Sequence, residues 1–90
     1  MSFDRIRRAF ADGRLTANPL DDGSGVVLDT AGERLLTMNA TGMALVQAIE
    51  AGTTDEAALT EVLTSRFEVD QERALADLRQ FVERLVEALN

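Results

Sequence analysis

The apolar positions of the chain change their period near the middle of the sequence. Before Met38 they fall in short alternating runs bounded by turn residues, which is the two-residue repeat of β-strands. After Ala40 they recur at spacings of three and four residues, which is the repeat of amphipathic helices. Asn39 lies at the switch, where its short side chain can accept hydrogen bonds from the first free amides of a helix. The pattern predicts a small sheet joined directly to a helical layer.

Three strands are predicted in the first half. A weak strand over Arg14 to Leu20 contains Pro19, which lacks an amide donor and confines that strand to an edge or a strand end. A turn-rich segment then leads into a β-branched strand at Val26 to Leu28. The tight turn Asp29 to Gly32, with a glycine available for positive φ, returns the chain as the second arm of a hairpin, Glu33 to Met38.

The second arm of this hairpin is apolar on both faces. Alternation places Arg34, Leu36 and Met38 on one face, and Leu35 and Thr37 on the other. Because both faces carry a leucine, we expect neither of them to be fully exposed to solvent. The arm is also expected to be an edge of the sheet, close to the helices that follow.

Two helices follow the hairpin. The first is predicted from about Ala40 to Ala51, with Gly52 as its stop. The second continues to about Arg66, and the pair Thr53 and Glu56 predicts a capping box at its start.

The third helix of this half is the longest, from about Gln71 to Leu89 behind a predicted cap at Asp70. Its apolar residues spread over an arc of roughly 160°, whereas about 100° is enough to anchor a surface helix. The surplus either covers a second helix or lines a groove that a ligand fills. Charged residues border the arc, with Arg73, Asp77 and Arg84 on one side and Arg79 on the other.

The order βββααα predicts an α+β fold class: a winged-helix-like domain with a small three-stranded antiparallel sheet followed by three helices. Residues 14–90 form this domain. Residues 1–13 precede it as an arginine-rich arm or short helix, in which Phe3, Ile6 and Phe10 fall on one side. This segment is interpreted either as a locally packed turn or as a basic docking arm for a partner protein.

The composition restricts the chemistry of the chain. Its 90 residues include no histidine, cysteine, tryptophan or tyrosine, which removes the commonest general base, the commonest metal ligand and the thiol nucleophile. We therefore expect that the chain is not an enzyme and has no catalytic residue, metal site or cofactor. No apolar run approaches the roughly 20 residues of a membrane span, and the charged N-terminus is unlike a secretion signal. A cytoplasmic protein without membrane contact is expected, and Met1 suggests a complete gene product.

The charge also restricts the partners. The net charge is −7 and all nine cations are arginines, so the chain repels phosphate backbones and nucleic-acid binding is disfavoured. The second and third predicted helices could form a helix-turn-helix, whose recognition helix should present basic and amide side chains at its start. Here Gln71 and Arg73 lie among Asp70, Glu72 and Asp77, which argues against DNA.

Three segments resemble PqqD-like proteins. Their order and spacing carry the likeness over about Leu15 to Leu89. The matching residues are Met38-Asn39-Ala40-Thr41-Gly42 followed by Leu45 to Ile49, Gly52 and Thr53; Asp77-Leu78-x-x-Phe81-Val82-x-x-Leu85; and Gly25 to Gly32. Met38 stands where the family usually has leucine, and the arginine-rich segment before Gly13 has no counterpart in the family.

The resemblance implies a recognition element for ribosomally synthesised, modified peptides (a RiPP recognition element). Such a domain binds the leader region of a precursor peptide as an added strand on its third strand, over its last helix. It then presents the peptide to a maturation enzyme, such as a radical-SAM enzyme, a cyclodehydratase or a leader peptidase. The peptide-binding residues expected on this basis are Arg34, Leu35, Leu36, Thr37, Met38, Arg73, Asp77, Leu78, Arg79, Phe81 and Val82.

An alternative from another class stays open at this point. The same element order fits a degenerate winged helix that regulates transcription or serves as an assembly module. We expect a monomer, although an edge strand left unpaired can also form a dimer by pairing with a second copy.

Overall fold

The computed structural model describes residues 3–89, so Met1, Ser2 and Asn90 lie outside the described part of the predicted segments. The three predicted strands and three predicted helices all form, in the expected order, and the α+β class is confirmed. A further helix precedes them. The elements are α1 Phe3–Ala11, β1 Leu15–Pro19, β2 Gly25–Asp29, β3 Arg34–Met38, α2 Ala40–Glu50, α3 Glu56–Arg66 and α4 Gln71–Leu89.

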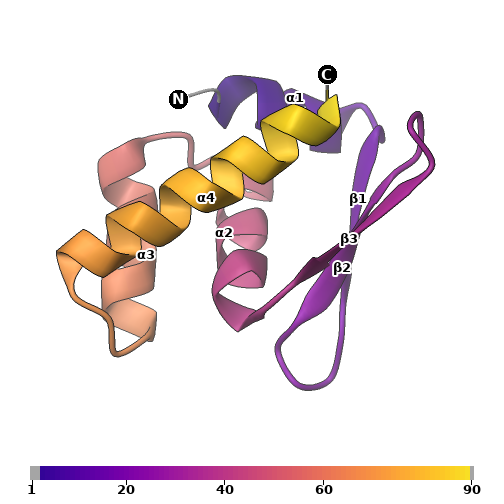
Figure 1. Ribbon diagram of the computed structural model, residues 1–90. Helices are drawn as coiled ribbons and strands as arrows, with labels where there is room; N and C mark the ends of the chain where they lie inside the picture. Colours follow the sequence, from indigo (N-terminus) through magenta and orange to yellow (C-terminus); the bar gives the residue numbers. More distant parts are fainter. Residues whose placement is uncertain (1–2, 90) are drawn as a thin grey trace.

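The sheet lies to one side of the helices, and α4 crosses the helical layer until its C-terminal end reaches α1 (Figure 1). The strands are antiparallel in the order β1-β2-β3, so β3 is an edge strand as predicted. Pro19 is the last residue of the other edge strand, β1, which agrees with its missing amide donor.

One face of the sheet packs on the core and the other is open. Leu15, Val27 and Met38 are buried on the inner face. On the outer face Leu28 pairs with Leu35 across the two strands, and these side chains are 37% and 59% exposed. Neither face of β3 was expected to be fully exposed to solvent, but the face of Leu35 is largely exposed, because none of the described helices covers that side of the sheet.

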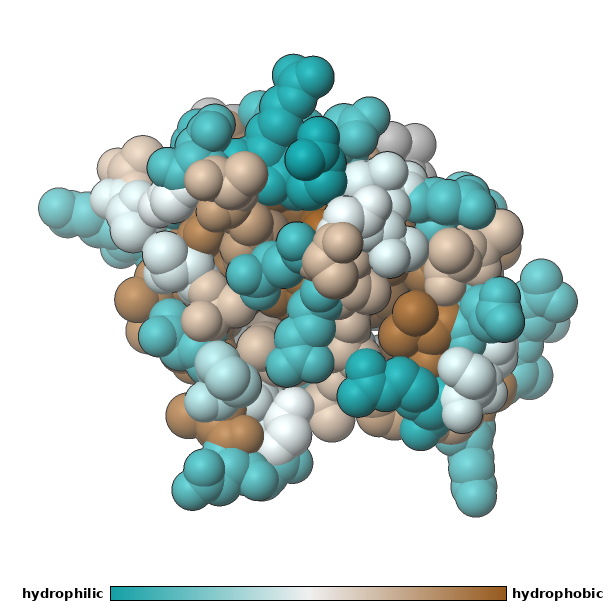
Figure 2. All heavy atoms as spheres, turned by 180° about the vertical axis from the view of Figure 1, so that it is seen from behind, coloured by the Kyte–Doolittle hydropathy of each residue, from teal (hydrophilic) through white to brown (hydrophobic). Residues whose placement is uncertain are grey.

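The core joins all the elements. Ile6 of α1, Leu45 and Ile49 of α2, Leu63 of α3 and Leu85 of α4 belong to one buried cluster. On the face drawn in Figure 2, polar side chains predominate and the apolar areas are small and separated from one another. None of the helices between residues 3 and 89 combines the length and the apolar character that a membrane crossing requires.

Two of the three predicted N-cap residues are confirmed. Asn39 Oδ1 accepts from the amide of Gly42 at 2.8 Å, and Asp70 Oδ1 accepts from the amide of Arg73 at 2.7 Å. The predicted capping box at Thr53 is wrong, because the N-cap of α3 is Asp55, whose side chain accepts from the amide of Ala57.

The reason is that Thr53 still belongs to the end of α2. Its amide donates to the carbonyl of Ala48 at 3.0 Å, and the amide of Gly52 donates to that of Ile49 at 2.9 Å. With Gly52 at a φ of 107°, this is the Schellman pattern of bonds that closes a helix. The backbone of Thr53 thus helps to end α2, and α3 begins only at Glu56, after its N-cap Asp55.

The β2–β3 turn also differs from the prediction. Gly32 does not have a positive φ; Glu33 does, at 53°. Glycine is required at position 32 for space, since a Cβ atom there would lie 2.6 Å from Oδ2 of Asp29. The Asp29 carboxylate is 1% exposed, accepts from the amide of Gly32 at 3.1 Å, and lies 3.6 Å from Nε of Arg14.

The N-terminal segment is a packed helix. Phe3, Ile6 and Ala9 are buried against the core, while Arg5 and Arg14 donate to the carbonyl of Leu89 at 3.2 and 3.1 Å. Arginines at this position satisfy a carbonyl that has no partner inside the helix and complement the negative end of the α4 dipole.

Candidate functional site

The free edge of β3 carries backbone groups that none of the described strands pairs with. The amide of Thr30 donates to Arg14 and the amide of Leu20 donates to Ser24, both at 2.8 Å, so the even-numbered residues of β2 bond to β1. The odd-numbered residues of β2 consequently bond to β3. From the register, Arg34, Leu36 and Met38 turn their backbone groups toward β2.

Leu35 and Thr37 therefore direct their N–H and C=O groups toward the open edge, away from β2. A hydrogen bond from α4 supports this orientation, since Nη2 of Arg84 donates to the carbonyl oxygen of Thr37 at 3.2 Å. The open edge offers two donors and two acceptors at the spacing that an added strand requires.

A groove runs beside this edge, between the end of β3, the start of α2 and one side of α4. We call it the β3–α4 groove; its volume is about 560 Å³. Its apolar part is formed by Met38, Leu45 and Phe81, which are all buried in the core beneath it. The complete lining consists of Thr37, Met38, Asn39, Thr41, Gly42, Leu45, Val69, Arg73, Asp77, Gln80, Phe81 and Arg84.

Helix α4 contributes to the groove through a single stripe. At 100° per residue, its five lining residues fall within an arc of about 100°. They are Arg73, Asp77, Gln80, Phe81 and Arg84. The neighbouring arc of the helix, which includes Leu78 and Leu85, faces the core.

The charges along this stripe are partly compensated. Nε of Arg73 lies 3.3 Å from Oδ1 of Asp77, an exposed ion pair one helical turn apart. Arg84 donates to a neutral carbonyl instead. Two arginines against one aspartate leave the groove with a positive balance in a chain whose net charge is −7.

Comparison with known proteins assigns the family. The family model described as coenzyme PQQ synthesis protein D (PqqD) matches residues 24–88, well over half of the chain. The chain belongs to the PqqD family. The match covers β2, β3 and the three following helices and leaves out α1 and β1.

Two solved structures share the fold of this PqqD-family chain. The structure described as TbiB1 in complex with the TbiA(beta) leader peptide has a TM-score of 0.72 at 20% identity, and the alignment covers 82% of this chain and 84% of that one. The structure described as lasso peptide synthetase B1 complexed with the leader peptide has a TM-score of 0.68 at 28% identity, with 82% and 85% covered. No curated protein matches the sequence.

The structure separates the expected site residues into three groups. Five of them line the β3–α4 groove: Thr37, Met38, Arg73, Asp77 and Phe81. Arg34, Leu35 and Leu36 lie on β3 outside the groove lining. Leu78 and Val82 are buried in the core, and Arg79 is exposed on another side of α4.

Several lining residues of this PqqD-family chain were not among those expected. Arg84 could have been predicted from the sequence, because it follows Arg73 by about three helical turns and borders the same side of the predicted apolar arc. Gln80 fits the same stripe. The α2 residues Thr41, Gly42 and Leu45 gave no such signal, since their distance from α4 depends on how the two helices pack.

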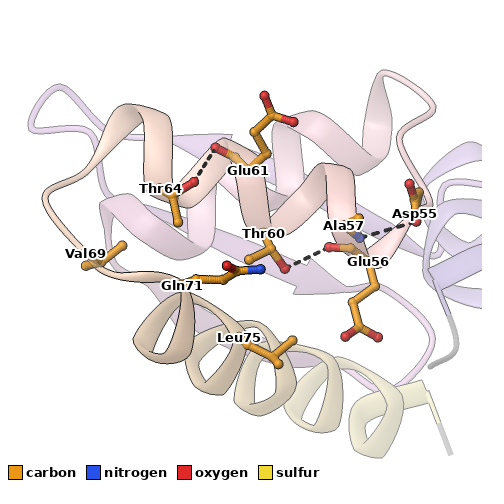
Figure 3. Close-up of a pocket in the computed structure, with 9 residues that line it drawn as sticks. All are labelled: Asp55, Glu56, Ala57, Thr60, Glu61, Thr64, Val69, Gln71 and Leu75. Carbon is orange, nitrogen blue, oxygen red and sulfur yellow. Dashed lines mark hydrogen bonds between the residues drawn. The ribbon is translucent and has the colours of Figure 1, made fainter.

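A second groove lies between α3 and α4, with a volume of about 770 Å³. Figure 3 shows Gln71 and Leu75 of α4 facing the α3 side chains across it. Most of its lining residues lie in helices, and the hydroxyl of Thr60 donates to the carbonyl of Glu56 at 2.8 Å. None of its lining residues belongs to a strand, whereas the β3–α4 groove lies beside a free strand edge.

Proposed function

We propose that this chain binds the leader region of a ribosomally synthesised precursor peptide by strand addition to β3, over α4, and presents it to a maturation enzyme. The observation that carries the proposal is the open edge of β3, where Leu35 and Thr37 direct their backbone groups outward beside the β3–α4 groove. Membership of the PqqD family supports it, as do two fold neighbours described in complex with leader peptides.

Two kinds of contact would hold the peptide. Main-chain hydrogen bonds to Leu35 and Thr37 contribute affinity that does not depend on the peptide sequence. Alternate side chains of the peptide contribute selectivity. Peptide side chains on the inner face would enter the β3–α4 groove over Met38 and Phe81. Those on the outer face would lie beside the exposed side chain of Leu35.

The proposal assigns no catalytic step to this chain. The sequence has no histidine and no cysteine, and we infer that a partner supplies the chemistry, such as a radical-SAM enzyme, a cyclodehydratase or a leader peptidase. The complex would form in the cytoplasm, where precursor peptides leave the ribosome. Among the expected contacts, Leu78 and Val82 are core residues and are left out of the proposed site.

The test removes one backbone donor from the open edge. In Thr37→Pro the outward amide is lost while the β2–β3 ladder keeps its bonds, so affinity for a strand-adding leader should fall about tenfold. The cognate leader peptide is labelled and titrated by fluorescence anisotropy, with circular dichroism to verify folding.

Ala17→Pro is the matched control, because Ala17 pairs with Val27 and turns its amide outward on the other edge strand, β1. It should leave leader affinity unchanged. A folded Thr37→Pro protein that binds the leader as tightly as the parent chain would exclude strand addition at this edge.

A further inference from the structure

We propose that Arg84 selects peptides that carry a carboxylate, by exchanging its bond to the Thr37 carbonyl for an ion pair with the bound peptide. The inference rests on the proposed function, because it requires a strand at the β3 edge. It goes further by assigning a specificity-determining residue and the chemistry of the peptide side chain that this residue recognises.

The first observation is that Arg84 holds an acceptor that an added strand needs. Its Nη2 donates to the carbonyl oxygen of Thr37 at 3.2 Å, across 47 positions in the sequence. That carbonyl is one of the outward-facing groups of β3. When a peptide amide donates to it, the guanidinium has to share the oxygen or move away.

The second observation is that Arg84 has no acidic partner among the described residues. Among residues 3–89, the ion pairs join Arg7 to Asp4, Arg14 to Asp29 and Arg73 to Asp77, and none involves Arg84. Asp77 on the same stripe is held by Arg73 at 3.3 Å. The one carboxylate in the groove lining, that of Asp77, is already paired with Arg73, so a guanidinium released from Thr37 finds no unpaired carboxylate among the described lining residues.

Strand geometry places a peptide side chain within reach. Side chains alternate between the two faces of an added strand, so the residue opposite Thr37 points outward with it and its neighbours point inward toward α4. Arg84 lines that inner side. A glutamate or aspartate at one of these inward positions can receive both arms of the guanidinium, a stronger bond than the one to a neutral carbonyl.

The groove thus uses one arginine in two ways. In the free chain Arg84 occupies a backbone acceptor at the exposed edge, which makes that edge less available to a strand of the wrong sequence. In the bound chain the same side chain forms an ion pair with an acidic residue of the peptide. A neutral peptide competes for the Thr37 carbonyl and offers Arg84 no charged partner in exchange.

The experiment uses a displayed library of random 16-residue peptides, selected on the folded full-length chain. Peptides that bind about tenfold more weakly to Thr37→Pro are kept, and one is synthesised with glutamate and with glutamine at its enriched acidic position. The chain should bind the glutamate form about three- to fivefold more tightly, as expected for a solvent-accessible ion pair. In Arg84→Met, which keeps the apolar stem, the two forms should bind equally and the glutamine form should bind at least as tightly as to the parent chain.

Arg79→Met is the matched control, since it removes one charge from another side of α4. It should keep the preference for glutamate, which separates a local contact from a change in net charge. Arg84→Lys should keep part of the preference, because the charge remains and the planar fork is lost.

The outcomes separate the inference from the function on which it rests. Peptides that depend on the Thr37 amide but show no acidic enrichment, or a preference that survives in Arg84→Met, would overturn the role of Arg84 and leave strand addition standing. If no selected peptide depends on the Thr37 amide, strand addition itself fails, and the role of Arg84 fails with it.

Discussion

Asp29 is the buried charge around which the β2–β3 turn is built. Its carboxylate is 1% exposed, and Oδ1 accepts from the amide of Gly32 while facing Nε of Arg14. Neither Oδ2 of Asp29 nor Nε of Arg14 has a hydrogen-bond partner among the described residues. The interaction is therefore mainly electrostatic, and it needs the space left by the missing side chain of Gly32.

We expect Asp29→Ala to destabilise the fold by about 2 kcal/mol, because it removes the acceptor of the Gly32 amide and the carboxylate that faces Nε of Arg14. Urea unfolding followed by circular dichroism measures the change. Asp21→Ala, in the exposed β1–β2 turn, serves as the control and should change stability by less than about 0.5 kcal/mol. Equal unfolding midpoints for the two variants would contradict this role for Asp29.

Asn39 begins α2 and also lines the β3–α4 groove. Asn39→Ala removes the 2.8 Å bond from the Gly42 amide, and we expect a loss of about 1 kcal/mol in the free energy of unfolding. Asn18→Ala, at an exposed position on β1, should leave that energy nearly unchanged. The cap would be unimportant if thermal melts of the two variants coincided.

At the scale of elements, helix α1 packs into the core, although the family match begins only at residue 24. It packs against α2, β1 and α4, and two arginines near it bind the last described carbonyl of α4. These contacts make α1 a structural part of the fold.

We expect Ile6→Ala to lower the free energy of unfolding by about 3 kcal/mol, because a side chain that is 0% exposed would leave a cavity between α1 and the core. Arg8→Ala, on the exposed side of the same helix, is the control for helix propensity and charge. Denaturant titration measures both. Similar midpoints for the two variants would mean that α1 does not contribute to the stability of the core.

The elements themselves could be predicted well from the sequence. The helices after Asn39 begin and end within about one residue of their predicted positions, apart from the start of α3. Local signals set these bounds: the caps Asn39 and Asp70, the stop at Gly52, and the apolar periodicity of α4. The candidate site could be predicted only in part. The apolar arc of α4 does not distinguish groove residues from core residues: Phe81 and Leu78 of the same motif are both buried, but only Phe81 also lines the groove.

At the scale of the whole molecule, charge argues against the transcriptional alternative. The net charge is −7, and the start of α4 places Asp70 and Glu72 beside its few basic groups. We expect no measurable binding to a 20-base-pair duplex at about 50 mM salt, since the phosphate backbone dominates such binding. Fluorescence anisotropy tests this, with a known winged-helix DNA-binding domain as the positive control. Binding that weakens steeply with added salt would instead favour a DNA-binding role.

The sequence by itself determined what depends on neighbours along the chain. Alternation and 3.6-residue spacing specify strands and helices, Asn39 and Asp70 begin helices through bonds to amides three residues away, and the absence of histidine and cysteine limits the chemistry. The stretch from β3 through Asn39 into α2 could be predicted from the sequence for this reason. Each of its features is local.

Only the tertiary structure decided which of these local features meet. It exposed the Leu28–Leu35 pair, buried Asp29 beside Arg14, and brought Arg84 of α4 to the Thr37 carbonyl at the β3 edge. These contacts join segments that are far apart in the sequence, and their existence depends on how whole elements pack. A residue pattern states which face a side chain occupies, whereas the packing of the chain decides what lies opposite it.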